Sequence, residues 1–593
     1  MEQTTLNHVK GGSFLLEETD PYNVFTPEDF SEQHQMISKT TSDFVDNEIL
    51  PRINDIDDQK DGLTVSLLKK AGEVGLLSID VPEEYGGLEL GITSSILVAE
   101  HIGRTGSWAV SHGAHTGIGT LPIVFFGTED QKKKYLPRFA TGEWISSYSL
   151  SEPSSGSDAL SARTTAVLSP DNNHYLLNGT KMWLSNAGFA DVYITFAQVN
   201  GEKFSAFIIE KGFPGVSTGA EEKKMGIKGS STRQLILENA QVPVENLLGE
   251  IGRGHIIAFN ILNIGRFKLG AAAIGAAKKV IADSNSYAKT RMQFNKPIAD
   301  FGMIKHKLAE MAIRTFVGES MLYRTAGLID TVLKNINKES PNAAAQTLKG
   351  IEEYAIECSI LKVYCSEILD YVVDEGVQIF GGYGYSEEYP VARAYRDSRI
   401  NRIFEGTNEI NRLLIPAMLL KRSRKGELDL LRRATQLAND LLSVSSTNCE
   451  ANAIFSTQRK LIDNAKKLAV MMTGIVAQKF LERLSEQQEI LSNISDIVMD
   501  VYAMESVLLR VEKNLARETA NEIHIKIVKT FVNDTMVRVE MNARDILSST
   551  TEGDTLRTYL AVLKRFTKYT PLNTVALRRV IADELIGKEK YSL

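Results

Sequence analysis

Apolar residues recur at helical spacing along most of the chain, and one central region has a different texture. Residues 27 to about 145 form short amphipathic stretches separated by polar caps and glycines, which predicts a set of helices. Thr26 and Pro27 precede two acidic residues and suit an N-cap and an N1 proline, so we expect a helix to start there. The helical pattern returns from Gly254 to about Leu420, with Lys305 to Leu333 as one of its long stretches.

The central region consists of short segments rich in β-branched and aromatic residues. Turn pairs such as NG, GF, PG and KG separate them at short intervals, which is typical of a compact β domain. The clearest expected strands are His174 to Leu177, Lys181 to Ser185, Asp191 to Val199, Phe204 to Glu210 and Gln234 to Glu238.

A further helical region follows residue 420. Its clearest element carries apolar residues at alternating steps of four and three, which places them on one helical face. These residues are Ile490, Ile494, Ile497, Val501, Met504, Leu508 and Val511. We interpret the face as the buried core of a helical bundle, with a partner or membrane surface as the alternative.

These textures divide the 593 residues into five parts. At roughly 150 residues per domain the length alone suggests four domains. The pattern predicts an N-terminal extension (1–26), a helical domain (27–146), a middle β domain (147–252), a helical bundle (253–420) and an additional helical domain (421–593).

Composition narrows the class of protein without indicating its chemistry. The chain is 43% hydrophobic and 24% charged, with 67 basic and 74 acidic residues, which argues against a disordered chain and a polybasic nucleic-acid binder. Cys358, Cys365 and Cys449 form no CxxC pair, so we expect no disulfide framework and no structural zinc. No apolar run approaches ~18 residues, and the N-terminal residues have neither signal nor transit character. We therefore expect a cytoplasmic protein.

Several familiar signatures fail on their context. Residues 215–219 match GxSxG, but no amphipathic helix follows, as a nucleophile elbow requires. The acidic run at 55–61 has Lys60 where a calcium loop needs glycine, and it is expected to be a solvated turn. The single Gly-Lys pair is not in a Walker A loop, and the glycines at 381–384 lack GxGxxG spacing.

Two segments have the chemistry of a site for a flat polar ligand. Residues 148–158 (YSLSEPSSGSD) place small hydroxyl side chains around a proline and a glycine, which allows close approach to a ligand, although a linker could look similar. Residues 181–186 (KMWLSN) predict a strand on which Trp183 and Ser185 share one face. An aromatic plane beside a hydroxyl suits a heteroaromatic ring, but a half-buried Trp can equally belong to the core.

Two later segments make the interpretation specific. Five separated motifs resemble those of the acyl-CoA dehydrogenase flavoproteins in their order and spacing. They are residues 151–157, Trp183, 291–298 (RMQFNKPI), 378–385 (QIFGGYGY) and 396–410 (RDSRINRIFEGTNEI). Within this family, the sequence most resembles the very-long-chain branch. The segments that carry this closer likeness are 152–159, 224–228, 261–267, 402–408 and, in the tail, 500–504.

The resemblance implies a fold and an activity. The expected fold is mostly α with a central β domain: an N-terminal helical domain, a middle β-barrel-like domain and a C-terminal four-helix bundle, plus an additional C-terminal helical domain. The expected reaction is the FAD-dependent α,β-dehydrogenation of a long- to very-long-chain fatty acyl-CoA to the trans-2-enoyl-CoA, the first step of fatty acid β-oxidation. Electrons then pass to an electron-transfer flavoprotein.

The resemblance also assigns roles to individual residues. Glu405 matches the catalytic base, and the alternative base position of some family members is Gly265 here, which cannot act. The residues expected to bind FAD are Tyr148, Leu150, Ser151, Gly156, Trp183, Ser185, Arg291, Phe294, Gln378, Gly381, Gly382, Thr407, Asn408 and Glu409. The residues expected to contact substrate are Ser157, Asn263, Arg266, Phe404 and Gly406. No metal is expected.

The family arrangement further implies how the chain assembles. Arg291, Phe294 and residues 378–382 would reach the FAD of a neighbouring subunit, which implies at least a dimer. The ~170 residues beyond 420 would cover the surface that tetrameric relatives bury, so we expect a homodimer. No nucleic acid is expected as a partner.

Three alternatives stay open at this point. One relative with the same tail suggests an assembly or scaffold protein with weak or secondary enzyme activity, and a flavin monooxygenase shares the fold but generally lacks the glutamate base. Peripheral membrane contact is a further possibility. Arg432 and Arg433 favour it, whereas Glu427, Asp429 and Asp440 dilute the basic charge and the segment 443–448 is uncharged.

Overall fold

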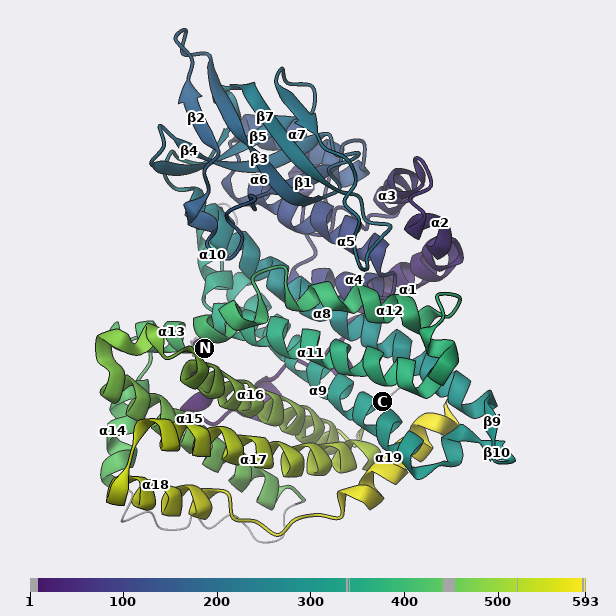
Figure 1. Cartoon of the computed structure of the whole chain (residues 1–593), viewed down its shortest axis with the longest axis vertical. Coiled ribbons are helices and arrows are strands. Elements are labelled where there is room, and N and C mark those ends of the chain that lie inside the picture. The colour runs from purple at the N-terminus through teal and green to yellow at the C-terminus, as the bar shows by residue number, and fades with distance from the viewer. Residues whose placement is uncertain are drawn as a thin grey trace, which may run out of the picture.

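The structure is a computed structural model that describes residues 9–337, 340, 342–440, 454–519, 521–588 and 591. Cys449 and the uncharged segment 443–448 lie outside these residues. Figure 1 shows the β sheet at one end of the molecule, the C-terminal helices at the other, and α4, α8 and α12 between them. The fold is mostly helical with a central β sheet and an extra C-terminal helical region, as expected.

Among the N-terminal helices, α1 and α5 pack on α4, which in turn packs on α8. The bounds of the N-terminal helices are α1 Glu32–Phe44, α2 Ile53–Asp57, α3 Leu63–Glu73, α4 Ile92–Gly103, α5 Ser107–Gly113, the π-helix η7 Ala114–Gly119, α6 Leu121–Phe126 and α7 Glu129–Thr141. A helical turn does start at Pro27, but it is shorter than the expected helix. It is the 3-10 turn η3 Pro27–Asp29, which is capped by Thr26 and Asp29. The first α-helix begins after Ser31, whose side chain accepts a hydrogen bond from the His34 amide.

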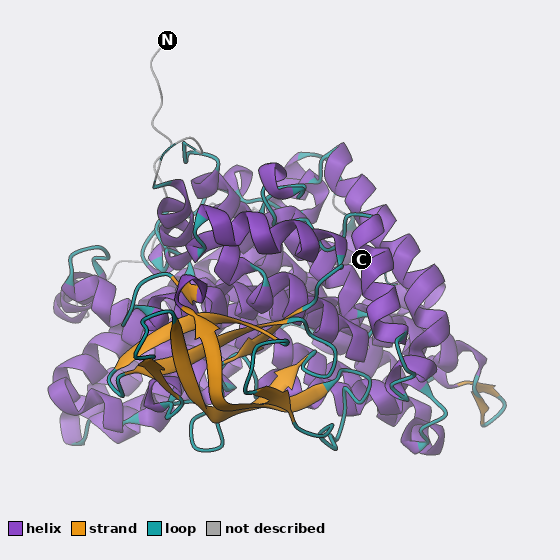
Figure 2. Ribbon diagram, turned by 90° about the horizontal axis from the view of Figure 1, so that it is seen from above, coloured by secondary structure: helices purple, strands orange, loops and turns teal. Residues whose placement is uncertain are grey.

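The sheet contains eight strands in the order β6-β7-β3-β2-β4-β5-β8, with β1 paired to β4. Their bounds are β1 Ser146–Ser149, β2 Thr165–Leu168, β3 His174–Ser185, β4 Val192–Val199, β5 Lys203–Glu210, β6 Val216–Thr218, β7 Thr232–Pro243 and β8 Leu247–Leu248. Figure 2 shows the strands as one curved layer against the helices. Residues 216–218 of the GxSxG segment form strand β6, which pairs with β7, so the segment lies in the sheet and not in a loop of the β domain, and no helix follows it directly.

The pairing of β3 with β7 shifts register between Lys181 and Leu184. Trp183 lies within this irregularity with a φ of 65°. The simple alternation that placed Trp183 and Ser185 on one face is therefore interrupted by a bulge, which re-aims the indole.

The helical bundle is built around α8. Its helices are α8 Gly254–Thr290, α9 Gly302–Leu333, α10 Ala343–Glu352, α11 Ala355–Phe380, α12 Pro390–Ser398 and α13 Asn408–Arg424. We expected no segment able to span a membrane, but α8 meets that test by length and composition alone. Within its most apolar window 61% is buried inside the protein, and α8 packs on α4, α9 and α11, which is the environment of a core helix.

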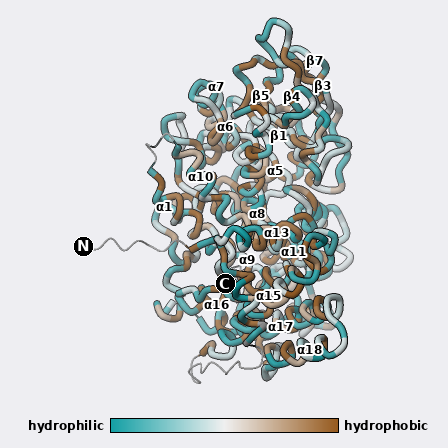
Figure 3. Tube along the Cα trace, turned by 90° about the vertical axis from the view of Figure 1, so that its left-hand side faces the viewer, coloured by the Kyte–Doolittle hydropathy of each residue, from teal (hydrophilic) through white to brown (hydrophobic). Residues whose placement is uncertain are grey.

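The C-terminal helices continue this bundle. They are α14 Leu430–Asp440, α15 Ser456–Phe480, α16 Gln488–Ala516, α17 Glu522–Thr550, α18 Gly553–Phe566 and α19 Thr574–Gly587. The apolar face expected from Ile490 to Val511 lies on α16 and is buried, which confirms the core interpretation. In Figure 3 polar and apolar colours alternate along α15, α17 and α18, the mark of amphipathic helices.

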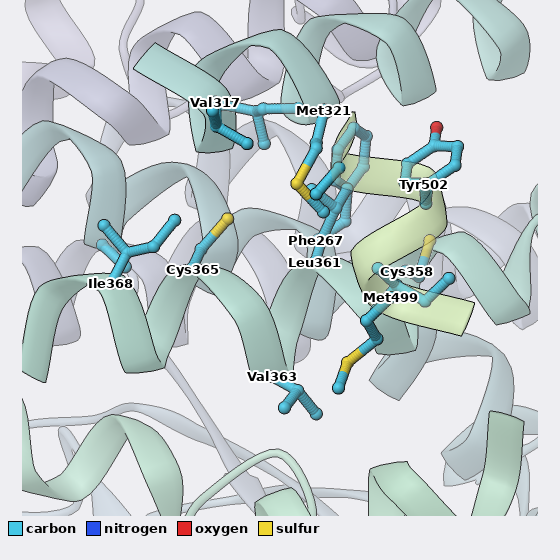
Figure 4. Packing of buried hydrophobic residues seen from close by; sticks show 14 of the residues in the cluster. Phe267, Val317, Met321, Cys358, Leu361, Val363, Cys365, Ile368, Met499 and Tyr502 are labelled. Carbon is cyan, nitrogen blue, oxygen red and sulfur yellow. The ribbon is translucent and has the colours of Figure 1, made fainter. Parts of the chain in front are cut away.

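One apolar core joins the C-terminal helices to the bundle. Figure 4 shows Met499 and Tyr502 of α16 beside Cys358 and Leu361 of α11. Cys358 and Cys365 are both buried, and both are free thiols. The described part of the N-terminal extension enters the same core: Phe14 is buried, and the Gly12 amide donates to the Glu357 carboxylate at 2.7 Å.

Candidate functional site

Glu405 lies on the loop between the 3-10 turn η12 Arg399–Arg402 and α13. Its φ is 59° and that of Gly406 is 78°, so two successive residues adopt the left-handed conformation. Such a conformation costs a non-glycine residue ~1 kcal/mol or more and persists only when the surroundings hold it. The turn ends at Thr407, whose hydroxyl caps α13 by accepting from the Ile410 amide at 3.2 Å.

The Glu405 carboxylate fills a space that only a glycine on α8 leaves open. A Cβ atom placed on Gly265 would lie 2.6 Å from Glu405 Oε2. The loop position and the α8 position therefore converge on one point in space, and a single carboxylate can stand there.

Burial determines the protonation of this carboxylate. It raises the pKa of Glu405 to about 7, against the opposing effect of the Arg266 and Lys362 charges. Oε2 is buried and has no hydrogen-bond partner among the described residues. Burial and the Glu405 charge also raise the pKa of the nearby Tyr148 phenol well above its usual range. A half-neutral, unpaired carboxylate near pH 7 is suited to accepting a proton.

Arg266 of α8 is hydrogen-bonded to the loop that carries Glu405, and Asn263 of α8 is hydrogen-bonded to Arg266. The Arg266 Nε–H donates to the Glu405 carbonyl at 3.1 Å, and its Nη1 donates to Asn263 Oδ1 at 3.0 Å. Both residues were expected to contact substrate. In the described contacts Arg266 holds the loop backbone and Asn263 orients Arg266, so both help to position Glu405.

A cavity of about 410 Å³ begins at Glu405 and Gly265 and is also lined by Phe404 and Ser185. Its wall follows one face of α8 as far as Asp283, about 27 Å at 1.5 Å per residue. Many of its other lining residues are small and come from α4, α5, η7 and α8. They include Ala99, Gly103, Gly106, Gly113, Gly117, Ala272, Ala273 and Ala276. The cavity is long and mostly apolar, which suits an alkyl chain.

The residues expected around a flavin ring lie next to this cavity. The hydroxyls of Tyr148 and Ser149 are buried without a described partner, and Ser185 lines the cavity. Trp183 is 59% exposed, although most large aromatic side chains of the sheet are buried. Orphaned hydroxyls and an uncovered indole fit a planar polar cofactor such as FAD.

The loop after β1 is held by a buried ion pair that sequence reasoning did not assign. Lys181 Nζ lies 2.8 Å from Glu152 Oε1, with the lysine side chain fully buried. Glu152 also accepts from the amides of Arg163 and Thr164. These bonds shape a loop on which Leu150 and Ser151 are half-buried and Gly156 and Ser157 are exposed.

The remaining expected cofactor residues lie elsewhere. Arg291, Gly381 and Gly382 line a second cavity of about 610 Å³, and no described residue lines both cavities. Phe294 is 87% exposed at the β9–β10 hairpin (Met292–Gln293 and Lys296–Pro297), which projects from the body in Figure 1. Gln378 is exposed on α11. A single chain does not bring these residues to Glu405.

Asn408 differs most from its expected role. It is buried, and its Oδ1 accepts from Lys362 Nζ at 2.7 Å while its Nδ2 donates to Ser366 and Glu367. Its side chain is used inside the chain, whereas Glu409 beside it is exposed.

Lys362 was missed by the sequence analysis. It is a fully buried lysine on α11, and burial lowers its pKa to about 7 despite the nearby Glu405. The available signal was a single lysine among the apolar residues Ile360, Leu361 and Val363. Among the residues that the structure describes, no three His, Cys, Asp or Glu side chains are grouped as metal ligands.

Four family models match the chain in order. The N-terminal, middle and C-terminal domains of acyl-CoA dehydrogenase match residues 31–143, 147–240 and 252–420. A further model, also described as an acyl-CoA dehydrogenase C-terminal domain, matches residues 464–565 within the extra helical region.

Individual relatives agree with these models. A probable acyl-CoA dehydrogenase of Bacillus subtilis (strain 168) is 52% identical over 586 residues, covering 98% of both chains. The very long-chain specific acyl-CoA dehydrogenase of Homo sapiens mitochondria is 33% identical over 93% of this chain and 86% of its own. A crystal structure of an acyl-CoA dehydrogenase from Bacillus anthracis, complexed with FAD, is 52% identical with a TM-score of 0.96, covering 99% of this chain and all of that one. With the glutamate loop, the long apolar cavity and these matches in agreement, the chain belongs to the acyl-CoA dehydrogenase family.

Proposed function

We propose that the protein oxidises long- to very-long-chain fatty acyl-CoA thioesters to trans-2-enoyl-CoA with FAD, the first step of fatty acid β-oxidation. The observation that carries this proposal is the unpaired Glu405 carboxylate facing Gly265 at the head of a long apolar cavity. The relatives named above are acyl-CoA dehydrogenases, which supports the same reaction class.

In this mechanism Glu405 removes one α-proton of the thioester. An α-C–H is a weak acid, so the base must be ionised when it acts and shielded from water. Burial provides the shielding and raises the pKa of Glu405 to about 7, while the Arg266 and Lys362 charges oppose that rise and keep part of the carboxylate ionised at neutral pH. The Glu405 backbone N–H is proposed to donate to the thioester carbonyl, a type of contact worth ~3 kcal/mol in the transition state. FAD, when bound, supplies the acceptor for the β-hydride.

The proposed cofactor contacts follow the two cavities. Tyr148, Ser149, Trp183 and Ser185 would hold the ring, with Leu150, Ser151 and Gly156 on the adjoining loop. Thr407 and Glu409 would contribute from the start of α13. The distal residues would serve the FAD of a second subunit in a homodimer. These are Arg291, Phe294, Gln378, Gly381 and Gly382.

Substrate length is proposed from the cavity. Its wall extends far along α8, and a Cβ atom on Gly113 would meet no atom within 4 Å, so this glycine leaves open space. Ser157 and Phe404 are proposed to contact substrate near the thioester.

An electron-transfer flavoprotein is the proposed electron acceptor. We also propose a reducing, cytoplasmic compartment, which the free thiols of Cys358 and Cys365 support.

The deciding experiment is anaerobic reduction of the bound flavin by palmitoyl-CoA. Wild type should bleach, whereas Glu405→Gln should retain FAD and lose at least about a thousandfold in bleaching rate, because the glutamine amide cannot accept the α-proton. A wild-type flavin that stays oxidised would point instead to a scaffold protein or a monooxygenase. Full turnover by Glu405→Gln would contradict the assignment of the base.

A further inference from the structure

Arg412 of α13 lies between a helix of the catalytic bundle and a helix of the C-terminal region. Its Nε–H donates to Asp496 of α16 at 2.8 Å. Its two terminal nitrogens donate to the two carboxylate oxygens of Glu367 on α11, at 2.7 and 2.9 Å. Ser495, next to Asp496, donates its hydroxyl to the Arg412 carbonyl. Helix α16 therefore holds both the side chain and the backbone of α13.

The contacts continue from Arg412 toward the catalytic loop. Glu367 Oε1 also accepts from Asn408 Nδ2 at 3.0 Å. Asn408 is the first residue of α13, three residues after Glu405, and its Oδ1 accepts from Lys362. The Lys362 charge in turn acts on the Glu405 carboxylate. A series of hydrogen bonds and ion pairs thus leads from Asp496 on the C-terminal helix α16 to Asn408 at the start of α13 and to Lys362, whose charge lies close enough to act on Glu405.

The distribution of burial indicates what this series does. Asn408 and Lys362, at the loop end, are buried, so their orientation is costly to change. Arg412, Glu367 and Asp496 keep 17%, 40% and 30% of their side chains exposed, and such ion pairs contribute little to global stability. Bidentate Arg–carboxylate geometry instead gives directional constraint. The series is suited to fixing the first turn of α13.

We propose that Asp496 is a positioning residue, through which the C-terminal helices hold Arg412, Glu367 and Asn408 and so fix the loop that carries Glu405. The inference rests on the proposed function of Glu405 as the base, since it explains how the loop is kept in its left-handed turn. It assigns the extra helical region a part in catalysis, in addition to covering surface.

The test compares two ion pairs that both join the C-terminal helices to the bundle. Asp496→Asn weakens the Arg412 contact, whereas Asp583→Asn breaks the ion pair from α19 to Lys305 on α9, which does not contact the loop. Both variants are studied as FAD-loaded enzyme by amide hydrogen exchange over residues 403–413 and by anaerobic flavin reduction with palmitoyl-CoA.

We expect Asp496→Asn to exchange faster over residues 403–413 and to lower the maximal rate of flavin reduction about tenfold at unchanged substrate KM. Asp583→Asn should match wild type in both measurements, and Asp496→Glu should recover part of the rate. Equal exchange and equal rates in Asp496→Asn and wild type would overturn the proposal, as would an equal effect of Asp583→Asn.

A second variant covers the case in which Asp496→Asn does not fold. Arg412→Lys keeps the charge and loses the two-pronged contact, and it should give the same local exchange and rate effects. Failure of the proposed function is separately visible, because wild type itself would then leave its flavin oxidised. The exchange comparison does not depend on turnover and still decides whether Asp496 orders the loop.

Discussion

At the scale of single residues, the candidate site depends on one carboxylate, that of Glu405, whose Oε2 is buried without a hydrogen-bond partner among the described residues. Arg266 of α8, Lys362 of α11 and Tyr148 of β1 surround Glu405. Burial outweighs the two cations, so the ionised form is disfavoured and the pKa rises to about 7. The Glu405 carboxyl is therefore partly protonated and partly ionised near neutral pH.

This pKa predicts a pH profile. Proton removal requires ionised Glu405, so the rate of flavin reduction at low substrate should rise as the pH passes through about 7. Stopped-flow bleaching between pH 5.5 and 8.5 would measure it. A flat profile over that interval would contradict the prediction.

The same shift affects stability with the opposite sign. A carboxyl whose folded pKa is about 7 and whose reference value is 4.5 stabilises the fold fully below 4.5 and loses that contribution as the pH rises through 7. Glu405→Gln should therefore be the more stable protein at pH 8, by at most about 3 kcal/mol. Thermal unfolding at pH 5 and pH 8 should show the difference widening with pH.

Gly265 allows a second prediction at this scale. A methyl group there would lie 2.6 Å from Glu405 Oε2 and force the carboxylate away. Gly265→Ala should lower the flavin reduction rate about a hundredfold while FAD stays bound, since small misplacements of a base are costly. Gly270→Ala, whose added Cβ would contact Leu361 at an ordinary 3.4 Å, is the matched control on the same helix. Equal rates in the two variants would count against the placement of Glu405.

At the scale of elements, the cavity is a product of helix packing. Glycine and alanine positions on α4, α5, η7 and α8 leave a channel beside α8. Close approach also depends on glycines that face backbone: a Cβ on Gly275 would overlap the Glu100 carbonyl of α4. The cavity length thus follows from where small residues meet.

Gly113 provides the test of this element-scale argument. Its Cβ direction is open, so a larger side chain can enter the cavity without clashing with the backbone. Gly113→Leu should shift the preferred substrate toward shorter chains, with stearoyl-CoA losing about tenfold or more in kcat/KM and butyryl- or hexanoyl-CoA little changed. A substrate series with a dye acceptor measures it, and an unaltered preference would place the acyl chain elsewhere.

At the scale of the whole molecule, the chain holds two separate sets of expected cofactor residues. One set surrounds Glu405, and the other lines the second cavity around Arg291 and Gly381. The exposed Phe294 hairpin projects beyond the body. In the proposed homodimer, a second copy of the chain would bring the two sets together and cover the Phe294 side chain, which a single chain leaves in water.

Subunit pairing is therefore testable through Phe294. Phe294→Asp should weaken dimerisation and FAD retention together, because a charge at an apolar contact loses its hydration. Sedimentation velocity gives the mass, and the flavin absorbance per chain gives occupancy. Met303→Asp, a change at another exposed apolar side chain, serves as a comparison. A Phe294→Asp protein that remains a fully loaded dimer would rule out this contact.

The sequence by itself determined the architecture and singled out Glu405 as the candidate base. Hydrophobic periodicity is local, so the buried face of α16, the long helices and the strand-rich centre could be inferred without tertiary contacts. Glu405 and Gly265 could be identified because their motifs are contiguous. The pattern could not predict the bulge at Trp183 or the shortened first turn at Pro27, which depend on strand pairing and on caps.

Only the tertiary structure decided how distant residues act on one another. Lys362, Arg412 and Asp496 come from three helices and carry no shared motif, yet they form one series of contacts ending at the Glu405 loop. Asn408 likewise belongs to the family motif, but its side chain is hydrogen-bonded to Lys362 inside the chain. The physical reason is that hydrogen bonding and desolvation depend on spatial neighbours, whereas sequence patterns report mainly which face of each element is buried.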